Sequence, residues 1–258
     1  MIPVDLGQKV ILITGALGAI AEYIVRTLTQ AGATLILTDI VPEAEAARRL
    51  EDWQIPPEQW VYKVMDVTDE QAVDRVVSEA FSAYPDLDTA LGHAGGCGLH
   101  FFRETRGEDF DRIVAFNFLG QTYFARALLR AWVARRIKGH LIFTSSYVAK
   151  VPHQGIPAYA SAKAALESFA RCLALEYADH EIRFNLVSPG NVAAGSSLKV
   201  FHEDEAYREM VLRVTPLKRQ NKPEAVANAF LYLCSSLADE LNGHVLDVDL
   251  GVSIPKIG

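Results

Sequence analysis

The chain has 258 residues, half of them apolar and 22% charged, which is enough to bury the core of an ordinary globular protein. The net charge of −7 argues against nucleic acid or an anionic membrane as the main partner, because both are bound by basic surfaces. Residues 1–9 lack an apolar signal core and no apolar stretch is long enough to span a bilayer, so a cytoplasmic location is expected. The three cysteines are far apart, so neither a metal site nor a disulfide framework is expected.

Short β-branched and apolar runs alternate with longer stretches of helical period. Most of these runs lack in/out alternation, as strands do when both faces of their sheet are covered. The predicted strands are Val10–Thr14, Thr34–Thr38, Trp60–Met65, Thr89–Leu91, Leu141–Ser145, Arg183–Val187 and Val245–Val248. This order predicts an α/β fold, a Rossmann-like doubly wound parallel sheet of about seven strands with helices on both faces. A single domain over residues 1–258 is the simplest organisation.

Three of the predicted helices carry most of the information. Thr68-Asp69-Glu70-Gln71 has the order of a capping box, and an apolar stripe follows it: Ala72, Val73, Val76, Val77 and Ala80. The segment Phe110–Trp132 predicts one long helix, and Ala158–Tyr177 predicts another that is apolar on most of its faces. Such a helix must be buried on two sides, which favours an oligomer.

The first strand leads directly into a glycine turn, Thr14 to Ala21, and then into a helix. Gly15 permits the tight turn, and Gly18 lets the backbone come close to a ligand. Backbone N–H groups and the helix dipole can meet a pyrophosphate at such a turn. A glycine turn without a ligand is the alternative interpretation.

The second strand is followed by Asp39, some twenty residues after the glycines. A carboxylate there can accept hydrogen bonds from a ribose 2′-OH and would repel a 2′-phosphate. Ala16, Leu17 and Ile40 offer no cation to compensate, so the pattern favours NAD over NADP. Alternatively, Asp39 only begins a loop.

Tyr159 and Lys163 stand four residues apart, which places a phenol and an ammonium on one helix face. A nearby cation stabilises a phenolate and would make the tyrosine a usable base, although this spacing also occurs by chance on surfaces. Ser146 follows the fifth predicted strand, at the sheet edge where ligands bind. Asn117 interrupts an apolar helical stretch and is either a buried amide bonded to backbone or part of the same site.

Together these elements resemble the short-chain dehydrogenase/reductase family, in the family's order and over nearly the full length. The matching positions are Thr14-Gly15, Asp39, Asp66-Val67, Ala94-Gly95, Asn117, Ser146, Tyr159 with Lys163, Pro189-Gly190, Lys222-Pro223-Glu224, and Asn242-Gly243-His244 through Asp249-Leu250-Gly251. So many ordered motifs would coincide by chance far more rarely than any one of them.

The resemblance implies a catalytic tetrad. Tyr159 would be the general acid/base, Ser146 would orient the substrate oxygen, Lys163 would lower the Tyr159 pKa and hold the nicotinamide ribose, and Asn117 would anchor a water that relays protons. The positions implied for NAD binding are Gly15, Leu17, Gly18, Ala19, Ile20, Asp39, Ile40, Asp66, Val67, Ala94, Gly95, Tyr159, Lys163, Pro189, Gly190 and Val192. The resemblance also suggests a homotetramer.

Three positions depart from the family pattern. Ala21 stands where the last glycine of the turn is common, and Gly92-His93-Ala94-Gly95 replaces Asn-Asn-Ala-Gly. Ala194 stands where a threonine often contacts the nicotinamide carboxamide, a bond that Ser196 or Ser197 could supply instead.

The expected function is hydride transfer between NAD and a secondary alcohol or ketone. Tyr147, His153, Gln154 and Asn191 favour a small polar substrate such as a sugar, polyol or hydroxy acid, under a lid at 195–215. One alternative is an NAD-using epimerase or dehydratase of the extended type, although little sequence follows the sixth strand. The other is a non-catalytic NAD-binding protein on the same fold.

Overall fold

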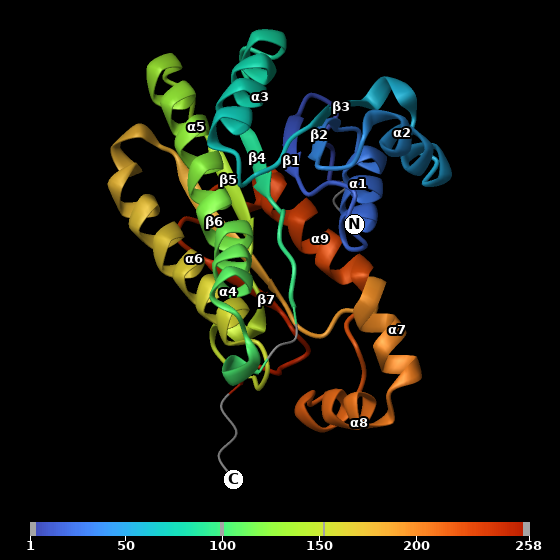
Figure 1. The fold of residues 1–258 in the computed structure, drawn as a ribbon. Coiled ribbons are helices and arrows are strands. Elements are labelled where there is room, and N and C mark those ends of the chain that lie inside the picture. The colour runs from blue at the N-terminus through green and yellow to red at the C-terminus, as the bar shows by residue number, and fades with distance from the viewer. Residues whose placement is uncertain (1–3, 99–100, 152, 255–258) are drawn as a thin grey trace.

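Within the residues that the computed structural model describes (4–98, 101–151 and 153–254), seven parallel strands form one sheet (Figure 1). They are β1 (Val10–Thr14), β2 (Thr34–Asp39), β3 (Trp60–Val64), β4 (Thr89–Gly92), β5 (His140–Thr144), β6 (Arg183–Pro189) and β7 (Val245–Val248). Their order in the sheet is β3-β2-β1-β4-β5-β6-β7. The predicted doubly wound sheet is confirmed, with strand ends that differ from the predicted ones by at most two residues.

The strand order reverses at β1, which pairs with β2 on one side and with β4 on the other. Because all the strands are parallel, their carboxyl ends lie along one edge of the sheet. In open sheets of this kind, ligands bind outside that edge at the point of reversal. The turn after Thr14 and the loop after Gly92 therefore lie at the centre of the expected site.

Helices cover both faces of the sheet (Figure 1). One face carries α1 (Ala21–Gln30), α2 (Glu43–Asp52) and α9 (Pro223–Cys234), and the other carries α3 (Glu70–Ala83), α4 (Gly107–Val114), α5 (Gly120–Arg135) and α6 (Pro157–Glu176). Two further helices, α7 (Gly195–Glu203) and α8 (Glu205–Val214), project from this sandwich near the carboxyl edge (Figure 1). None of the helices in the described part of the chain is long and apolar enough to cross a membrane.

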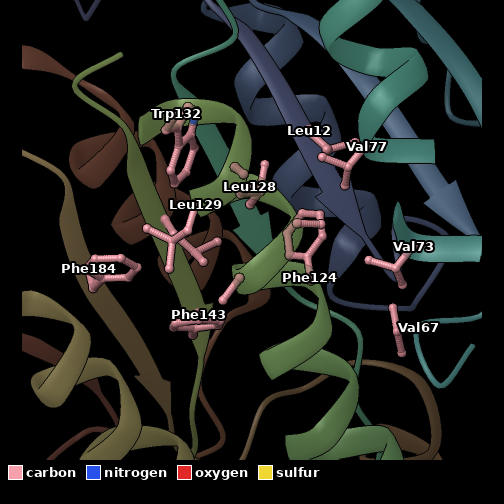
Figure 2. Close-up of a cluster of buried hydrophobic side chains, with 14 of the residues drawn as sticks. Leu12, Val67, Val73, Val77, Phe124, Leu128, Leu129, Trp132, Phe143 and Phe184 are labelled. Carbon is pink, nitrogen blue, oxygen red and sulfur yellow. The ribbon is translucent and has the colours of Figure 1, made fainter. Parts of the chain in front are cut away.

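Alternate strand residues contribute to two separate apolar cores. Leu12 of β1 packs with α3 and α5, whereas its neighbours Ile11 and Ile13 pack with α1 and α9. Figure 2 shows the first core, where Phe124 and Trp132 of α5 lie among strand side chains. Both faces of the strands are thus buried, which explains why the strands read as continuous apolar runs.

The start of α3 corrects one prediction. Asp69, not Thr68, caps the helix, and its carboxylate accepts hydrogen bonds from the backbone N–H groups of Gln71 and Ala72. The Thr68 hydroxyl instead donates to the Asp66 carboxylate at 2.7 Å. The stripe predicted for this helix is confirmed, since every member of it is buried.

The predicted long helix over Phe110–Trp132 is interrupted in its middle. A π-helical turn, η3 (Ala115–Leu119), separates α4 from α5. Asn117 lies in this turn, and its side-chain Nδ2 donates to the carbonyl of Ile113 four residues earlier, at 2.9 Å. A side chain that enters the backbone ladder in this way is a known cause of local helix distortion, and π turns are frequent at functional sites.

Candidate active site

The glycine turn lies against the loop that follows β4. Gly15 has φ +65°, and a Cβ there would lie 2.6 Å from the Cα of Ala94, so only glycine fits. The Thr14 hydroxyl accepts hydrogen bonds from the N–H groups of His93 and Ala94, both at 3.1 Å. The turn and the loop are therefore fixed to each other at the centre of the carboxyl edge.

The amino end of α1 fits a phosphate group. Among the described residues no side chain caps this helix at Ile20, and Gly18 and Ala19 before it are exposed. A Cβ at Gly18 would only make ordinary contacts, so packing within the protein does not require glycine there. Free N–H groups at the positive end of a helix, with an open backbone beside them, are what a diphosphate needs.

Asp39, at the end of β2, organises the rim of the same turn. Its carboxylate accepts hydrogen bonds from the N–H of Leu17 at 3.0 Å and from the N–H of Ile40 at 2.8 Å. The Arg49 guanidinium on α2 donates to the carbonyl of Leu17 at 3.3 Å and pairs with Glu45. Arg49 was not predicted from the sequence, because this cation reaches the turn from a helix ten residues beyond Asp39.

The loop after β3 packs closely on α5. Val67 is buried, and a Cβ at Gly120 would lie 2.8 Å from the Val67 carbonyl oxygen. The Asp66 carboxylate accepts hydrogen bonds from Thr68 and thereby shapes the turn. These contacts hold Asp66 and Val67 near the loop after β4, as expected if both loops serve one ligand.

His93, one of the departures from the family pattern, joins the ends of β4 and β5. Its Nδ1 lies 2.8 Å from the Thr144 hydroxyl, and its ring packs edge-on against Phe230. Burial, with a smaller effect of the Lys163 charge, lowers the pKa of His93 to about 4. The imidazole is therefore neutral at physiological pH and acts as a hydrogen-bonding bridge.

The Ser146 and Tyr159 hydroxyls meet beyond the end of β5. Ser146 begins the 3-10 turn after the strand, and Tyr159 lies in the first turn of α6. Burial raises the pKa of Tyr159 well above its ordinary value, and a hydrogen bond with Ser146 acts in the opposite direction. In the ligand-free protein the phenol is therefore protonated.

Lys163 is 2% exposed, and its ammonium lies 5.7 Å from the centre of the Tyr159 ring. Its Nζ donates a hydrogen bond of 2.7 Å to the carbonyl of Thr144. Burial lowers the pKa of Lys163 to about 8. A cation held in such surroundings attracts negative charge strongly, which is the condition for stabilising a phenolate or a bound hydroxyl.

Asn117 holds the loop after β4 from the π turn. Its Nδ2 donates to the Gly96 carbonyl at 2.9 Å, and its Oδ1 accepts from the Gly96 N–H at 3.0 Å. A Cβ at Gly95 would lie 2.9 Å from this Oδ1 and 3.1 Å from Lys163 Nζ. A side chain at position 95 would therefore crowd both the Asn117 amide and the Lys163 ammonium, and glycine lets the two groups approach the loop backbone.

These positions match a known family in sequence as well. A family model described as enoyl-(acyl carrier protein) reductase matches residues 15–253, most of the chain. The chain belongs to the short-chain dehydrogenase/reductase family. Its members are oxidoreductases that use a nicotinamide cofactor, and the seven-stranded parallel sheet is the fold that the family resemblance implied.

Similar proteins cover nearly the whole chain. A versicolorin reductase of Emericella nidulans is 30% identical over 95% of this chain and 96% of its own. The 2,3-dihydro-2,3-dihydroxybenzoate dehydrogenase of Bacillus subtilis is 29% identical, over 95% and 96%. A solved structure from Agrobacterium tumefaciens, with NADP bound, has a TM-score of 0.86 and 22% identity, covering 98% and 99% of the two chains. This last likeness shows the shared fold alone.

The segment after β6 carries the positions that in this family line the nicotinamide. Val192 forms a bridge with Asn221, and a Cβ at Gly190 would lie 2.8 Å from both the Asn221 Oδ1 and the Cα of Asp249. The Asn221 Oδ1 and the Ser188 hydroxyl are buried without a partner among the described residues. Unpaired buried polar atoms are costly, and a bound ligand or water is the usual reason for them.

Ala194 caps α7 where the family often has threonine, and Ser197 does not simply replace it. The Ser197 hydroxyl lies 3.1 Å from Gln220 Nε2 and 3.3 Å from the Tyr207 hydroxyl on α8. It thus joins α7 and α8 to the segment before α9. A Cβ at Gly195 would lie 2.8 Å from that of Ala19, so α7 begins directly over the glycine turn.

Two of the four polar residues predicted to face the substrate lie together. Tyr147 and Asn191 are buried, and the Tyr147 hydroxyl forms a long hydrogen bond of 3.5 Å with Asn191 Oδ1, while Asn191 Nδ2 has no partner among the described residues. Gln154 is exposed, and the His153 ring bonds to the Gln154 carbonyl. Tyr147 and Asn191 therefore form a buried polar pair, whereas the contact between His153 and Gln154 is local to that segment.

Two further residues support the site and were missed by the sequence analysis. Glu167 on α6 is 4% exposed and accepts a hydrogen bond of 2.8 Å from Ser145, next to Ser146. Gln121 on α5 is 1% exposed and donates to the carbonyl of Ala94 at 2.6 Å. Each is four residues beyond a tetrad position, Lys163 or Asn117, on a helix that is otherwise largely apolar. That spacing was the available signal.

Proposed function

We propose that the protein is an NAD-dependent dehydrogenase that interconverts a secondary alcohol and a ketone, with Tyr159 as the general acid/base. The observation that carries this proposal is the placement of Ser146, Tyr159 and the buried Lys163 ammonium together at the carboxyl edge of the sheet. When bound, the nicotinamide ring supplies the hydride or accepts it.

Each member of the tetrad performs a separate task. Ser146 and Tyr159 hold the substrate oxygen between their hydroxyls, and Tyr159 donates its proton when a ketone is reduced. The raised pKa of the phenol suits this direction, because the proton donor is already present. For alcohol oxidation the phenolate must form, and Lys163 stabilises it together with the positive charge of an oxidised nicotinamide. Asn117 anchors a water that relays protons to Lys163, the role that the family resemblance implies for it.

Asp39 is the basis for choosing NAD over NADP. The expected result of replacing Asp39 with alanine is at least a tenfold fall in the ratio of kcat/KM for NAD to that for NADP. The substitution removes a carboxylate that would repel a 2′-phosphate, and it retains Arg49, whose positive charge beside the Leu17 carbonyl would attract one. The ratio is measured by steady-state kinetics with both cofactors.

Asp52→Ala, at the exposed end of α2, is the matched control, because it removes one negative charge without touching the glycine turn. Its cofactor ratio should stay within about twofold of the wild-type ratio. A wild-type protein that prefers NADP would refute the choice of NAD.

A small polar substrate, such as a sugar, polyol or hydroxy acid, is the second part of the proposal. The buried Tyr147–Asn191 pair leaves the Asn191 amide donor free, and a purely aliphatic ligand would leave it unpaired. The Bacillus relative named above acts on a dihydroxylated ring, which is consistent with a polar pocket. Specificity constants for polyols, hydroxy acids, steroids and acyl thioesters provide the test. A steroid or long-chain acyl substrate that wins by about tenfold would contradict this part alone.

We further propose that residues 195–215 form a substrate lid on a single catalytic domain and that the chain assembles as a homotetramer. The lid consists of α7 and α8, which project beside the carboxyl edge. Leu119, at the start of α5, and Leu175, at the end of α6, are large apolar side chains left exposed, and Leu175 is 83% exposed. Light scattering at micromolar concentration should give four times the chain mass, and a monomer would contradict the assembly.

The two alternatives receive less support. The extended-type epimerases and dehydratases have a larger substrate domain, whereas the described residues after β6, up to 254, form α7, α8, α9, a short 3-10 turn and β7. A non-catalytic NAD-binding protein would have no need for a buried ammonium beside a tyrosine and a serine. Oxidation of NADH over a broad ketone panel separates these functions, since only a dehydrogenase changes the redox state of free cofactor.

A further inference from the structure

Two amide side chains from one helical stretch hold the loop that follows β4. Asn117 makes two hydrogen bonds to the backbone of Gly96, and Gln121 makes one to the carbonyl of Ala94. The two residues are four apart, so their side chains emerge from the same face. The backbone of Ala94 and Gly95 is thus held from both ends. Only one of these amides, Asn117, belongs to the tetrad.

Gly92, at the end of β4, is what gives Gln121 room. A Cβ on Gly92 would lie 2.4 Å from Gln121 Oε1 and 2.6 Å from Cδ1 of the buried Phe143. Real side chains do not approach so closely, so Gln121 in its present position excludes any side chain at 92. The family pattern has asparagine at this position. In this chain the Gln121 side chain of α5 carries an amide into the space that a side chain at position 92 of β4 would fill.

Of the two polar atoms in the Gln121 amide, only the nitrogen forms a hydrogen bond. Its Nε2 is 2.6 Å from the Ala94 carbonyl, whereas its Oε1 is buried without a partner in the described part of the chain. An unpaired buried acceptor destabilises the folded state, and an apolar residue of the same size would avoid that cost. A residue whose role was only to fill the core would therefore be methionine or leucine.

We propose that Gln121 is a positioning residue for the cofactor. Admitted by Gly92, it fixes the backbone of Ala94 and Gly95, against which the adenine half of NAD is held. This inference rests on the cofactor site of the proposed function. Gly15 lies against Ala94, so the same hydrogen bond also sets the distance between the loop and the glycine turn.

The test replaces Gln121 with methionine, which keeps the volume and removes the donor. We measure dissociation constants by fluorescence titration for NADH and by calorimetry for ADP-ribose, which keeps the adenine half and lacks only the nicotinamide ring. Both constants should rise by about tenfold, the usual scale for one buried hydrogen bond, because the loss lies in the adenine half. Gln121→Asn keeps an amide but is one methylene too short, so it should also raise both dissociation constants.

Leu129→Ala is the matched control, because it removes buried volume from the same helix away from the loop. It should lower the unfolding temperature at least as much as Gln121→Met and leave both dissociation constants within twofold of wild type. Equal affinities in wild type and both Gln121 variants would overturn the inference. A loss for NADH without a loss for ADP-ribose would also overturn it. A wild-type protein that binds neither ligand would overturn the cofactor site itself, and the inference with it.

Discussion

Replacing Tyr159 with phenylalanine is expected to lower turnover by about a hundredfold or more, the usual scale for a general acid/base. The substitution removes one hydroxyl, which is the group proposed to exchange a proton with the substrate. The ring, which lies near Lys163, is retained, so cofactor binding should be close to normal. Steady-state kinetics and NADH titration measure the two quantities separately.

Tyr177→Phe is the control for this experiment, because Tyr177 follows α6 far from the carboxyl edge and also loses only a hydroxyl. It should be as active as wild type. Near-normal turnover in Tyr159→Phe would remove Tyr159 from the mechanism, whereas lost cofactor binding would mean that its role is structural.

Replacing Lys163 with methionine is expected to inactivate the protein and, at the same time, to stabilise it. The ammonium is buried, and its pKa of about 8 lies below the ordinary value of 10.5, so the charged form is destabilised in the folded state. At neutral pH this shift corresponds to at most about 3 kcal/mol. The bond to the Thr144 carbonyl is lost, so a net gain of about 1–2 kcal/mol in the free energy of unfolding is expected.

The gain should depend on pH in a defined direction. Because the folded-state pKa is the lower one, the unfolded wild type binds more protons between pH 8 and 10.5, and wild-type stability rises with pH in that window. The advantage of Lys163→Met should be full below pH 8 and shrink toward pH 10.5. Urea unfolding at several pH values measures it. A variant that is less stable than wild type at pH 7 would show that the ammonium stabilises the fold.

The sheet could be predicted because its strands are apolar on both faces, a pattern that depends only on local sequence. The end of a strand is harder to predict from the sequence where a buried polar residue stands in place of an apolar one. His140 begins β5 although it is polar, because its Nε2 meets the Asn185 side chain of β6 at 2.9 Å. That partner is 45 residues away, and nothing in the local pattern indicates it.

The candidate site could be predicted where two residue types stand at a fixed spacing on one helix, as Tyr159 and Lys163 do on α6. It was not predictable where two distant positions compensate each other. Compared with the family pattern alone, Gly92 lacks the asparagine side chain. In the sequence alone, Gln121 is a polar residue of α5 with no evident partner. Only the packing of α5 against β4 shows that Gln121, in its present position, requires glycine at position 92. The π turn at Asn117 depends in the same way on the Gly96 backbone.

Transfer of deuterium is the most direct test of hydride transfer assisted by Tyr159. NADH with deuterium at both C4 positions of the nicotinamide is incubated with a panel of keto sugars, hydroxy ketones and keto acids, and the alcohol products are analysed by mass spectrometry. The proposed mechanism predicts one deuterium on the newly formed carbinol carbon with wild type, and about a hundredfold slower labelling with Tyr159→Phe. A wild type that binds NADH but labels no product, or a Tyr159→Phe variant that labels product at the wild-type rate, would contradict it.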